Sequence, residues 1–237
     1  YTVAFGDTYN ALAENLAASI RKNGSEFEYE MIAISDKHIN GWNTIRQESI
    51  NKIRSNLICD IPYTFKFAFL EEVVKISNSS NFIYLDSDSI CISKLKISNF
   101  FNYDLFIPRE TKLINLNTSW AGCKTNELIN LAEKLGIDKK YIYNCNGGFW
   151  SFKKDYYTKL KKQINHFCLN VKENIPEAVD EAVLSLLAGN YYKNNNLPNE
   201  NAYNNEFAAL NTKAVKYETI KTPYVEKEWL GNNIHNI

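Results

Sequence analysis

The sequence has 237 residues, of which 45% are hydrophobic and 23% are charged. Lys and Arg together number 27, as do Asp and Glu, so the formal net charge is zero. This balance argues against a general nucleic-acid binder, and the hydrophobic content argues against intrinsic disorder. No apolar run approaches the roughly 20 residues that span a bilayer. The length suits one large domain, and because no change of composition marks a domain boundary, we expect a single domain over residues 1–237.

The cysteines are scattered and lack any C-x-x-C pair. The five positions are Cys59, Cys91, Cys123, Cys145 and Cys168. An odd, dispersed set favours reduced thiols over a disulfide framework or a zinc site. We therefore expect a cytoplasmic protein.

The first 35 residues favour a β-α-β unit. Residues 2–5 are a short apolar run, and residues 7–22 carry apolar side chains on one helical face before Gly24. Residues 29–34 read as a second strand. Two strands joined by a helix are the unit of a parallel sheet.

The remaining chain alternates strand-like and helix-like segments, so it predicts an α/β fold throughout. Further strands are expected at residues 82–85, 105–108, 116–121 and 147–152. Further helices are expected at residues 63–76, 127–135, 155–169 and 176–188. Gly189 is expected to end the last helix, and the Asn-rich residues 190–205 to form a long loop.

The most specific pattern is Asp86-Ser87-Asp88, directly after the apolar strand of residues 82–85. Alternate strand residues point the same way, so both carboxylates can converge on one cation. Carboxylate oxygens suit the hard ions Mg²⁺ and Mn²⁺. In open α/β sheets, ligands bind beyond the carboxyl ends of the strands, where this motif stands. A solvated turn is the simpler alternative.

In this order, the β-α-β unit, the helix near Pro62, the I-Y-L-D-S-D run and the N-G-G-F-W-S-F run resemble the GT-A glycosyltransferases. The closest resemblance is to family 8, which includes bacterial lipopolysaccharide glycosyltransferases and glycogenin. It implies a GT-A fold, with a Rossmann-like, mostly parallel central sheet flanked by helices. It also implies a nucleotide-binding half (residues 1–100), an acceptor-binding half (residues 101–237), a UDP-sugar donor, and Mn²⁺ or Mg²⁺ as cofactor.

The resemblance assigns the nucleoside to the turn after the first strand. Ala4 lies in that turn, Asp7 would accept a hydrogen bond from the base, and Tyr9 would stack on it. The alternative is that Asp7 caps the following helix and Tyr9 packs against the protein.

The resemblance places four segments around the diphosphate and the sugar. Lys66 stands where the family has a basic residue, usually Arg, that faces the donor, although a solvated Lys would look the same. Asp86 and Asp88 would bind the metal, with Ser87 beside the ribose. The donor-sugar segment would be formed by Asn146, Gly147 and Gly148, where glycine lets the backbone approach a ligand closely. A simple glycine turn is the alternative.

Asp180 and Glu181 stand where the family has an Asp-Gln pair that reaches the transferred sugar. Glu in place of Gln adds a charge next to the reacting centre. The resemblance makes these two residues the expected catalytic pair, for orienting or stabilising the sugar. The solvated face of a helix would give the same pattern.

The family completes its metal site with a C-terminal His, and His235 stands at a corresponding place. The Gly, Lys and Trp of the family's C-terminal segment are missing from this sequence. Two explanations stay open. The tail continues beyond Ile237, which would allow peripheral membrane association, or this branch lacks it.

The sequence thus predicts a metal-dependent enzyme that transfers a sugar to a glycan, lipopolysaccharide or protein acceptor, with retention of anomeric configuration. A haloacid-dehalogenase-type phosphatase is one alternative, because Asp86-Ser-Asp88-Ser89-Ile90 loosely fits its motif. That motif normally lies near the N-terminus, whereas here a complete β-α-β unit precedes it. A sugar- or nucleotide-binding module without turnover is the second alternative.

Overall fold

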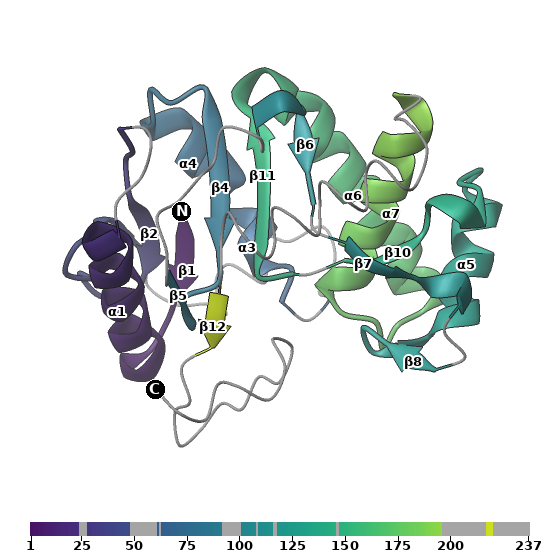
Figure 1. Ribbon diagram of the computed structural model, residues 1–237, viewed down its shortest axis with the longest axis horizontal. Helices are drawn as coiled ribbons and strands as arrows, with labels where there is room; N and C mark the ends of the chain where they lie inside the picture. The colour runs from purple at the N-terminus through teal and green to yellow at the C-terminus, as the bar shows by residue number, and fades with distance from the viewer. Residues whose placement is uncertain are drawn as a thin grey trace.

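The structure is a computed structural model, and it describes residues 1–23, 28–47, 61, 63–91, 101–107, 109–115, 118–145, 147–195 and 217–219 (Figure 1). The α-helices are α1 (Asp7–Asn23), α3 (Phe65–Ala68), α4 (Leu70–Ile76), α5 (Thr125–Lys134), α6 (Tyr157–Asn174) and α7 (Asp180–Asn194). The strands are β1 (Thr2–Ala4), β2 (Ile32–Ser35), β3 (Asn43–Arg46), β4 (Asn81–Leu85), β5 (Ser89–Cys91), β6 (Leu105–Phe106), β7 (Arg109–Lys112), β8 (Ser119–Trp120), β9 (Cys123–Lys124), β10 (Tyr143–Cys145), β11 (Phe149–Lys153) and β12 (Tyr217–Thr219). Short 3-10 helices cover Leu113–Asn115, Lys139–Tyr141 and Lys154–Tyr156.

The central sheet is built from two three-stranded parts. Strands β1, β2 and β3 pair in parallel, and β11 pairs antiparallel with both β4 and β6. The amide of Leu85 donates to the carbonyl of Tyr1 (3.0 Å), and the amine of Tyr1 donates to the carbonyl of Ile83, which is the pattern of a parallel pair. The resulting order is β3-β2-β1-β4-β11-β6, with β11 reversed. The predicted α/β class is confirmed.

Helices cover both faces of this sheet (Figure 1). On one face, α1 packs its Leu16 and Ile20 in one core with Leu85 and Phe149. On the other face, α4, α6 and α7 share a core with the aromatic residues of β4 and β11. Because successive strand residues point to opposite faces, each strand contributes to both cores.

Aromatic pairs across β4 and β11 fix the register of the antiparallel part. Tyr84 lies opposite Trp150, and Phe82 lies opposite Phe152. The ring centroids are 5.7 Å apart in the first pair and 5.1 Å apart in the second. Such cross-strand pairs stabilise a sheet by roughly 0.2–1 kcal/mol each.

Several predicted elements differ from the structure. The strand expected at residues 29–34 begins only at Ile32, and β3 was not predicted because its sequence, NTIR, is short and half polar. The helix expected at residues 63–76 is divided at Phe69, whose ψ of 2° interrupts the helical path.

The prediction that Gly189 ends the last helix is wrong. Helix α7 begins at Asp180 rather than near residue 176, and it continues to Asn194. Gly189 lies inside the helix, at a position where its neighbours leave no room for a side chain. A Cβ built there would lie 2.7 Å from Ile142 Cδ1 and 3.1 Å from the carbonyl oxygen of Tyr141. Packing therefore selects this glycine, although glycine is a poor helix former.

We expect Gly189→Val to lower the free energy of unfolding by about 1–2 kcal/mol, because the added methyl groups overpack this contact. Urea unfolding measures the change. Lys162→Val on the exposed side of α6 is the matched control, because it also places a β-branched residue in a helix but does not overpack a buried contact. Equal losses in the two variants would contradict the packing explanation.

Candidate functional site

The candidate site lies where β1 and β4 end side by side. β2 flanks β1 on one side and β4 flanks it on the other, so the connections leave in opposite directions at this point. Open α/β sheets bind ligands in the crevice outside such strand ends. Ala4 is the last residue of β1, and Asp86 directly follows β4. The amide of Asp86 donates to the carbonyl of Gly148 (2.9 Å), which joins two predicted segments.

Lys66 is the centre of the site. Its side chain extends from α3 and is buried, with 3% of the residue exposed. The Lys66 Nζ lies 2.6 Å from Asp180 Oδ2 and donates to the carbonyl oxygen of Gly147 at 2.8 Å. It also lies 3.7 Å from Asp86 Oδ1. The solvated-lysine alternative is therefore wrong, because this ammonium group is enclosed by protein oxygens.

A buried ammonium is costly unless it is paired and hydrogen-bonded. Asp180, the first residue of α7, is buried and supplies the closest negative charge. Asp180 therefore faces the interior rather than solvent, in contrast to the alternative of a solvated helix face. The contact joins α3 and α7, which are far apart in the sequence.

Glu181 and Gly147 form the second contact of α7 with the site. The amide of Gly147 donates to Glu181 Oε1 at 3.1 Å. Burial, followed by the charge of Asp180, raises the pKa of Glu181 from 4.5 to about 7. A Cβ on Gly147 would lie 2.9 Å from Asp180 Oδ2 and 3.3 Å from Lys66 Nζ. A side chain at Gly147 would thus collide with the protein's own charged groups, and the approach of its backbone to a donor sugar stays a prediction.

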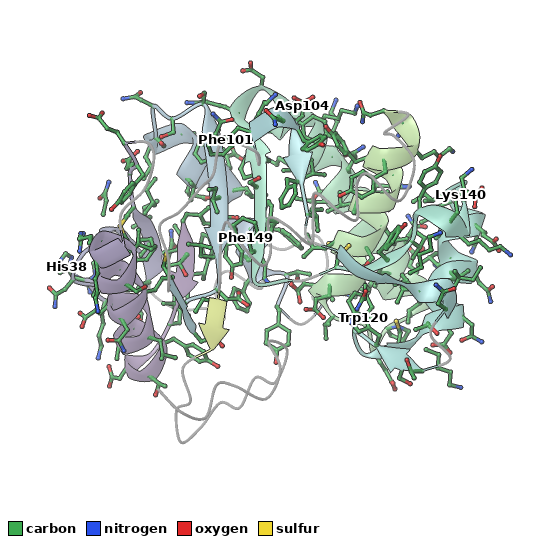
Figure 2. All side chains as sticks on the ribbon, viewed as in Figure 1. His38, Phe101, Asp104, Trp120, Lys140 and Phe149 are labelled. Atoms are coloured by element: carbon green, nitrogen blue, oxygen red, sulfur yellow. The ribbon has the colours of Figure 1, made fainter. Side chains whose placement is uncertain are left out.

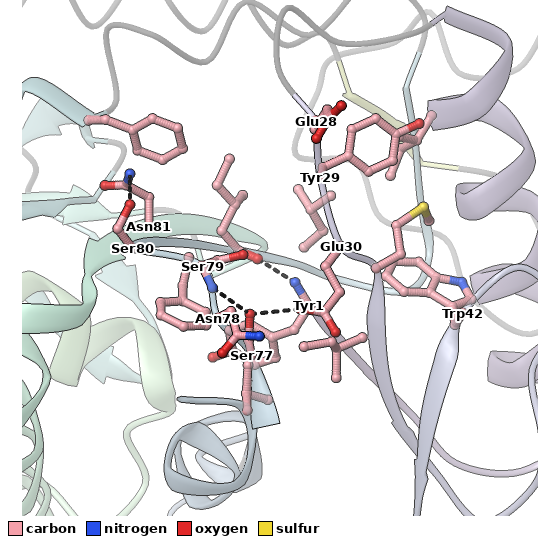
Figure 3. A pocket seen from close by; sticks show the side chains of 18 of the residues that line it. Tyr1, Glu28, Tyr29, Glu30, Trp42, Ser77, Asn78, Ser79, Ser80 and Asn81 are labelled. Atoms are coloured by element: carbon pink, nitrogen blue, oxygen red, sulfur yellow. Dashed lines mark hydrogen bonds between the residues drawn. The ribbon is translucent and has the colours of Figure 1, made fainter. Parts of the chain in front are cut away.

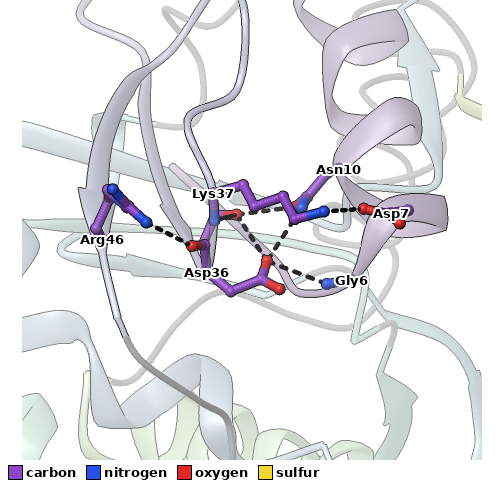
Figure 4. Close-up of polar contacts among 7 residues, drawn as sticks. Gly6, Asp7, Asn10, Asp36, Lys37 and Arg46 are labelled. Carbon is purple, nitrogen blue, oxygen red and sulfur yellow. Dashed lines mark hydrogen bonds and ion pairs between the residues drawn. The ribbon is translucent and has the colours of Figure 1, made fainter.

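Two predicted nucleoside residues are exposed to solvent, unlike the buried Lys66 and Asp180. Asp7 has a side chain that is 86% exposed, and it forms an ion pair with Lys37 (Figure 4). Tyr9 is 42% exposed on the first turn of α1. Both can be reached from solvent, and their roles stay predictions. His38 also lies exposed, at the edge of the molecule near α1 (Figure 2).

The turn between β1 and α1 is held by Asp36, which the sequence analysis missed. Asp36 Oδ1 accepts hydrogen bonds from the amide of Gly6 (3.1 Å) and from Asn10 Nδ2 (3.0 Å) (Figure 4). Ser35 Oγ donates to Asn10 Oδ1 at 2.8 Å. The hydrogen bonds that Asp36 accepts, above all the one from Asn10, lower the pKa of its carboxyl group. The position directly after β2 is the available signal, because polar groups at strand ends meet at one sheet edge.

The predicted metal ligands are described only in part. Asp86 and Asp88 are described, and Asp88 is buried. His235 lies outside the described residues, as does Asn146. Within the described ranges, no group of three or more His, Cys, Asp or Glu side chains is arranged to hold a metal ion. The two aspartates have the oxygen donors that Mn²⁺ and Mg²⁺ prefer, so the described donors suit such an ion in chemistry.

A C-terminal segment returns to the aspartates. β12 pairs antiparallel with β5, placing Thr219 opposite Ser89. Ser89 immediately follows Asp88, so a late part of the chain lies beside the D-x-D turn. The other described members of the predicted site, Ser87 and Gly148, are both buried.

A separate cavity of about 470 Å³ lies at the opposite, amino ends of the strands (Figure 3). Its lining includes Tyr29, Trp42, Phe101 and Phe149. None of the predicted site residues lines it. Ser77 Oγ donates to Glu30 Oε2 at 2.8 Å along its wall. The predicted site residues therefore lie apart from the lining of this cavity.

No protein-family model matches the chain, and no curated protein matches it. No described helix is long and apolar enough to cross a membrane.

Proposed function

We propose that the protein is a GT-A glycosyltransferase of the family 8 type, which transfers a sugar from a UDP-sugar to a glycan, lipopolysaccharide or protein acceptor. The strand order and the position of Asp86-Ser87-Asp88 at the carboxyl ends of the sheet support this proposal. The scattered cysteines, four of which are buried, support a location in the cytoplasm.

One observation carries the proposal. Three segments that the resemblance places around the donor, and that are far apart in the sequence, meet at the Lys66 ammonium group: those of Asp86, Gly147 and Asp180. Residues that were merely exposed on different parts of the surface would not be buried in contact with one another. Functional sites are places where charged groups are buried together at structural cost.

In the proposed reaction, the bond between the anomeric carbon and the diphosphate oxygen breaks, and its electron pair leaves with UDP. An acceptor hydroxyl forms the new bond to the anomeric carbon, and its proton passes to the departing diphosphate oxygen or to solvent. Positive charge near the leaving group stabilises the transition state. Lys66 supplies one such charge. Asp86 and Asp88 would hold Mn²⁺ or Mg²⁺, which supplies Lewis-acid stabilisation of the diphosphate when bound.

The first experiment is a thermal-shift comparison of UDP, GDP, CMP and ADP, each with and without Mn²⁺. A ligand at about 100 times its Kd adds roughly 2.7 kcal/mol of stability, which raises Tm by several degrees. We expect UDP with Mn²⁺ to give the largest shift. A shift only with Mg²⁺ and a phosphate mimic would instead favour the phosphatase.

Turnover then separates the enzyme from a binding module. We expect Asp88→Ala to lower the rate of UDP release from UDP-sugars at least about 100-fold, since it removes stabilisation of the leaving group. Asp155→Ala, which removes an exposed carboxylate in the 3-10 helix before α6, is the matched control and should keep the full rate. Nucleotide binding without any turnover in the native protein would leave the binding module as the better description.

A further inference from the structure

Tyr84 lies beneath the candidate site in the middle of β4. Only 1% of the residue is exposed. Its ring packs against Trp150 with the centroids 5.7 Å apart. In the sequence it is one letter of an apolar run, and its ring fills the core as that pattern predicts.

The hydroxyl of Tyr84 has a second role. It donates to Asp86 Oδ1 at 2.6 Å, a short hydrogen bond to a carboxylate. A phenol has a single proton to donate, so this bond fixes the direction of the hydroxyl and holds one carboxylate oxygen in place.

The ring of Tyr84 also faces the ammonium group. Lys66 Nζ lies 5.0 Å from the ring centroid, within the range of a cation–π interaction. The same Nζ lies 3.7 Å from Asp86 Oδ1, the oxygen that accepts from the Tyr84 hydroxyl. Tyr84 thus contacts both the positively charged Lys66 and the negatively charged Asp86.

We propose that Tyr84 is a positioning residue of the site, which holds Asp86 through its hydroxyl and Lys66 through its ring. This inference rests on the proposed function, because it assigns Asp86 to the metal and Lys66 to the diphosphate. Groups that orient a metal ligand from behind commonly affect metal affinity or activity by about 10–100-fold. The proposal extends that role to the tyrosine that precedes the D-x-D segment.

The test compares two variants that each lose one buried tyrosine hydroxyl. Tyr84→Phe keeps the ring under Lys66 and removes the hydrogen bond to Asp86. Tyr192→Phe removes a hydroxyl on α7 that donates to the carbonyl of Ile107 (3.3 Å), away from the candidate site. Both should lose a similar free energy of unfolding, about 1 kcal/mol, so stability alone does not distinguish them.

We expect Tyr84→Phe to raise the Kd for Mn²⁺, measured by titration in the presence of UDP, about 10–100-fold. kcat for the UDP-sugar should fall more than KM rises, because the positioned charges act on the leaving group. Tyr192→Phe should change neither quantity. Equal Kd values for Mn²⁺ in the two variants would overturn the positioning role.

A double-mutant cycle with Asp86→Asn is a second test, and it cancels any loss of stability that Tyr84→Phe causes equally in both backgrounds. If Tyr84 acts through Asp86, adding Tyr84→Phe to Asp86→Asn should cause no further rise in the Kd for UDP. The same additional rise in both backgrounds would mean a purely structural role. A native protein that binds UDP and Mn²⁺ but shows no Tyr84 effect refutes only this inference. A native protein that binds neither refutes the proposed function as well.

Discussion

Replacement of Lys66 by Met should lower the free energy of unfolding by about 3–5 kcal/mol, a loss large enough to unfold a marginally stable domain. Lys66 and Asp180 are both buried, with Nζ and Oδ2 2.6 Å apart. Methionine fills a similar volume but leaves the Asp180 carboxylate without its closest cation. The cost is that of an uncompensated buried charge, to which the nearby Asp86 adds.

Urea unfolding of two further variants checks the origin of this loss. Adding Asp180→Leu to Lys66→Met should recover most of the stability, because an apolar pair can replace a buried ion pair at little cost. Lys75→Met is the surface control: Lys75 pairs with Glu71 on α4, but its side chain is 70% exposed. It should cost less than about 1 kcal/mol. Equal effects at Lys66 and Lys75 would refute a buried ion pair.

The elements predicted well from the sequence are those with a complete local signal. α1 has an apolar face and an acidic first turn, and β4 contains the apolar run of residues 82–85 directly before the D-x-D segment. β11 was predicted as a strand, but its antiparallel pairing with both β4 and β6 depends on the arrangement of the whole sheet. Gly189 shows the opposite failure, because a residue that usually ends helices was selected here by packing against Ile142.

The site was predicted in part for a similar reason. The resemblance supplied Lys66, Asp86, Gly147 and Asp180, and the structure brings these four together. Tyr84 was missed although its position carried a signal: it stands two residues before Asp86, and alternate residues of a strand share a face. Which hydroxyl meets which carboxylate depends on side-chain packing, which a sequence pattern does not contain.

The network around Asp36 was missed because its partners come from two elements. Asp36 follows β2, whereas Gly6 and Asn10 belong to the turn and helix after β1. The sequence favoured Asp7 as the capping or binding carboxylate at this turn. In the structure Asp36 accepts the Gly6 amide, and Asp7 pairs with Lys37.

Glu181→Gln should remove a pH dependence of stability that the native protein shows between about pH 4.5 and 7. Burial and Asp180 raise the pKa of Glu181 from 4.5 to about 7 in the folded protein. Over that interval the folded state holds a proton that the unfolded state has released. Stability from this residue is therefore fully present below pH 4.5 and is lost as the pH rises to 7.

The shift corresponds to about 2 kcal/mol once the partial exposure of Glu181 is taken into account. Glutamine keeps an oxygen that can accept from the Gly147 amide, and it cannot ionise. The free energy of unfolding of the variant should therefore rise by that amount, relative to the native protein, between pH 4.5 and 7.5. Urea unfolding of both proteins with a metal chelator present measures the difference, and ionisations elsewhere cancel. Parallel pH profiles would mean that Glu181 titrates as an ordinary solvated carboxylate. If the native protein instead gained stability relative to Glu181→Gln as the pH rises, the positive charge of Lys66 would outweigh burial and stabilise ionised Glu181.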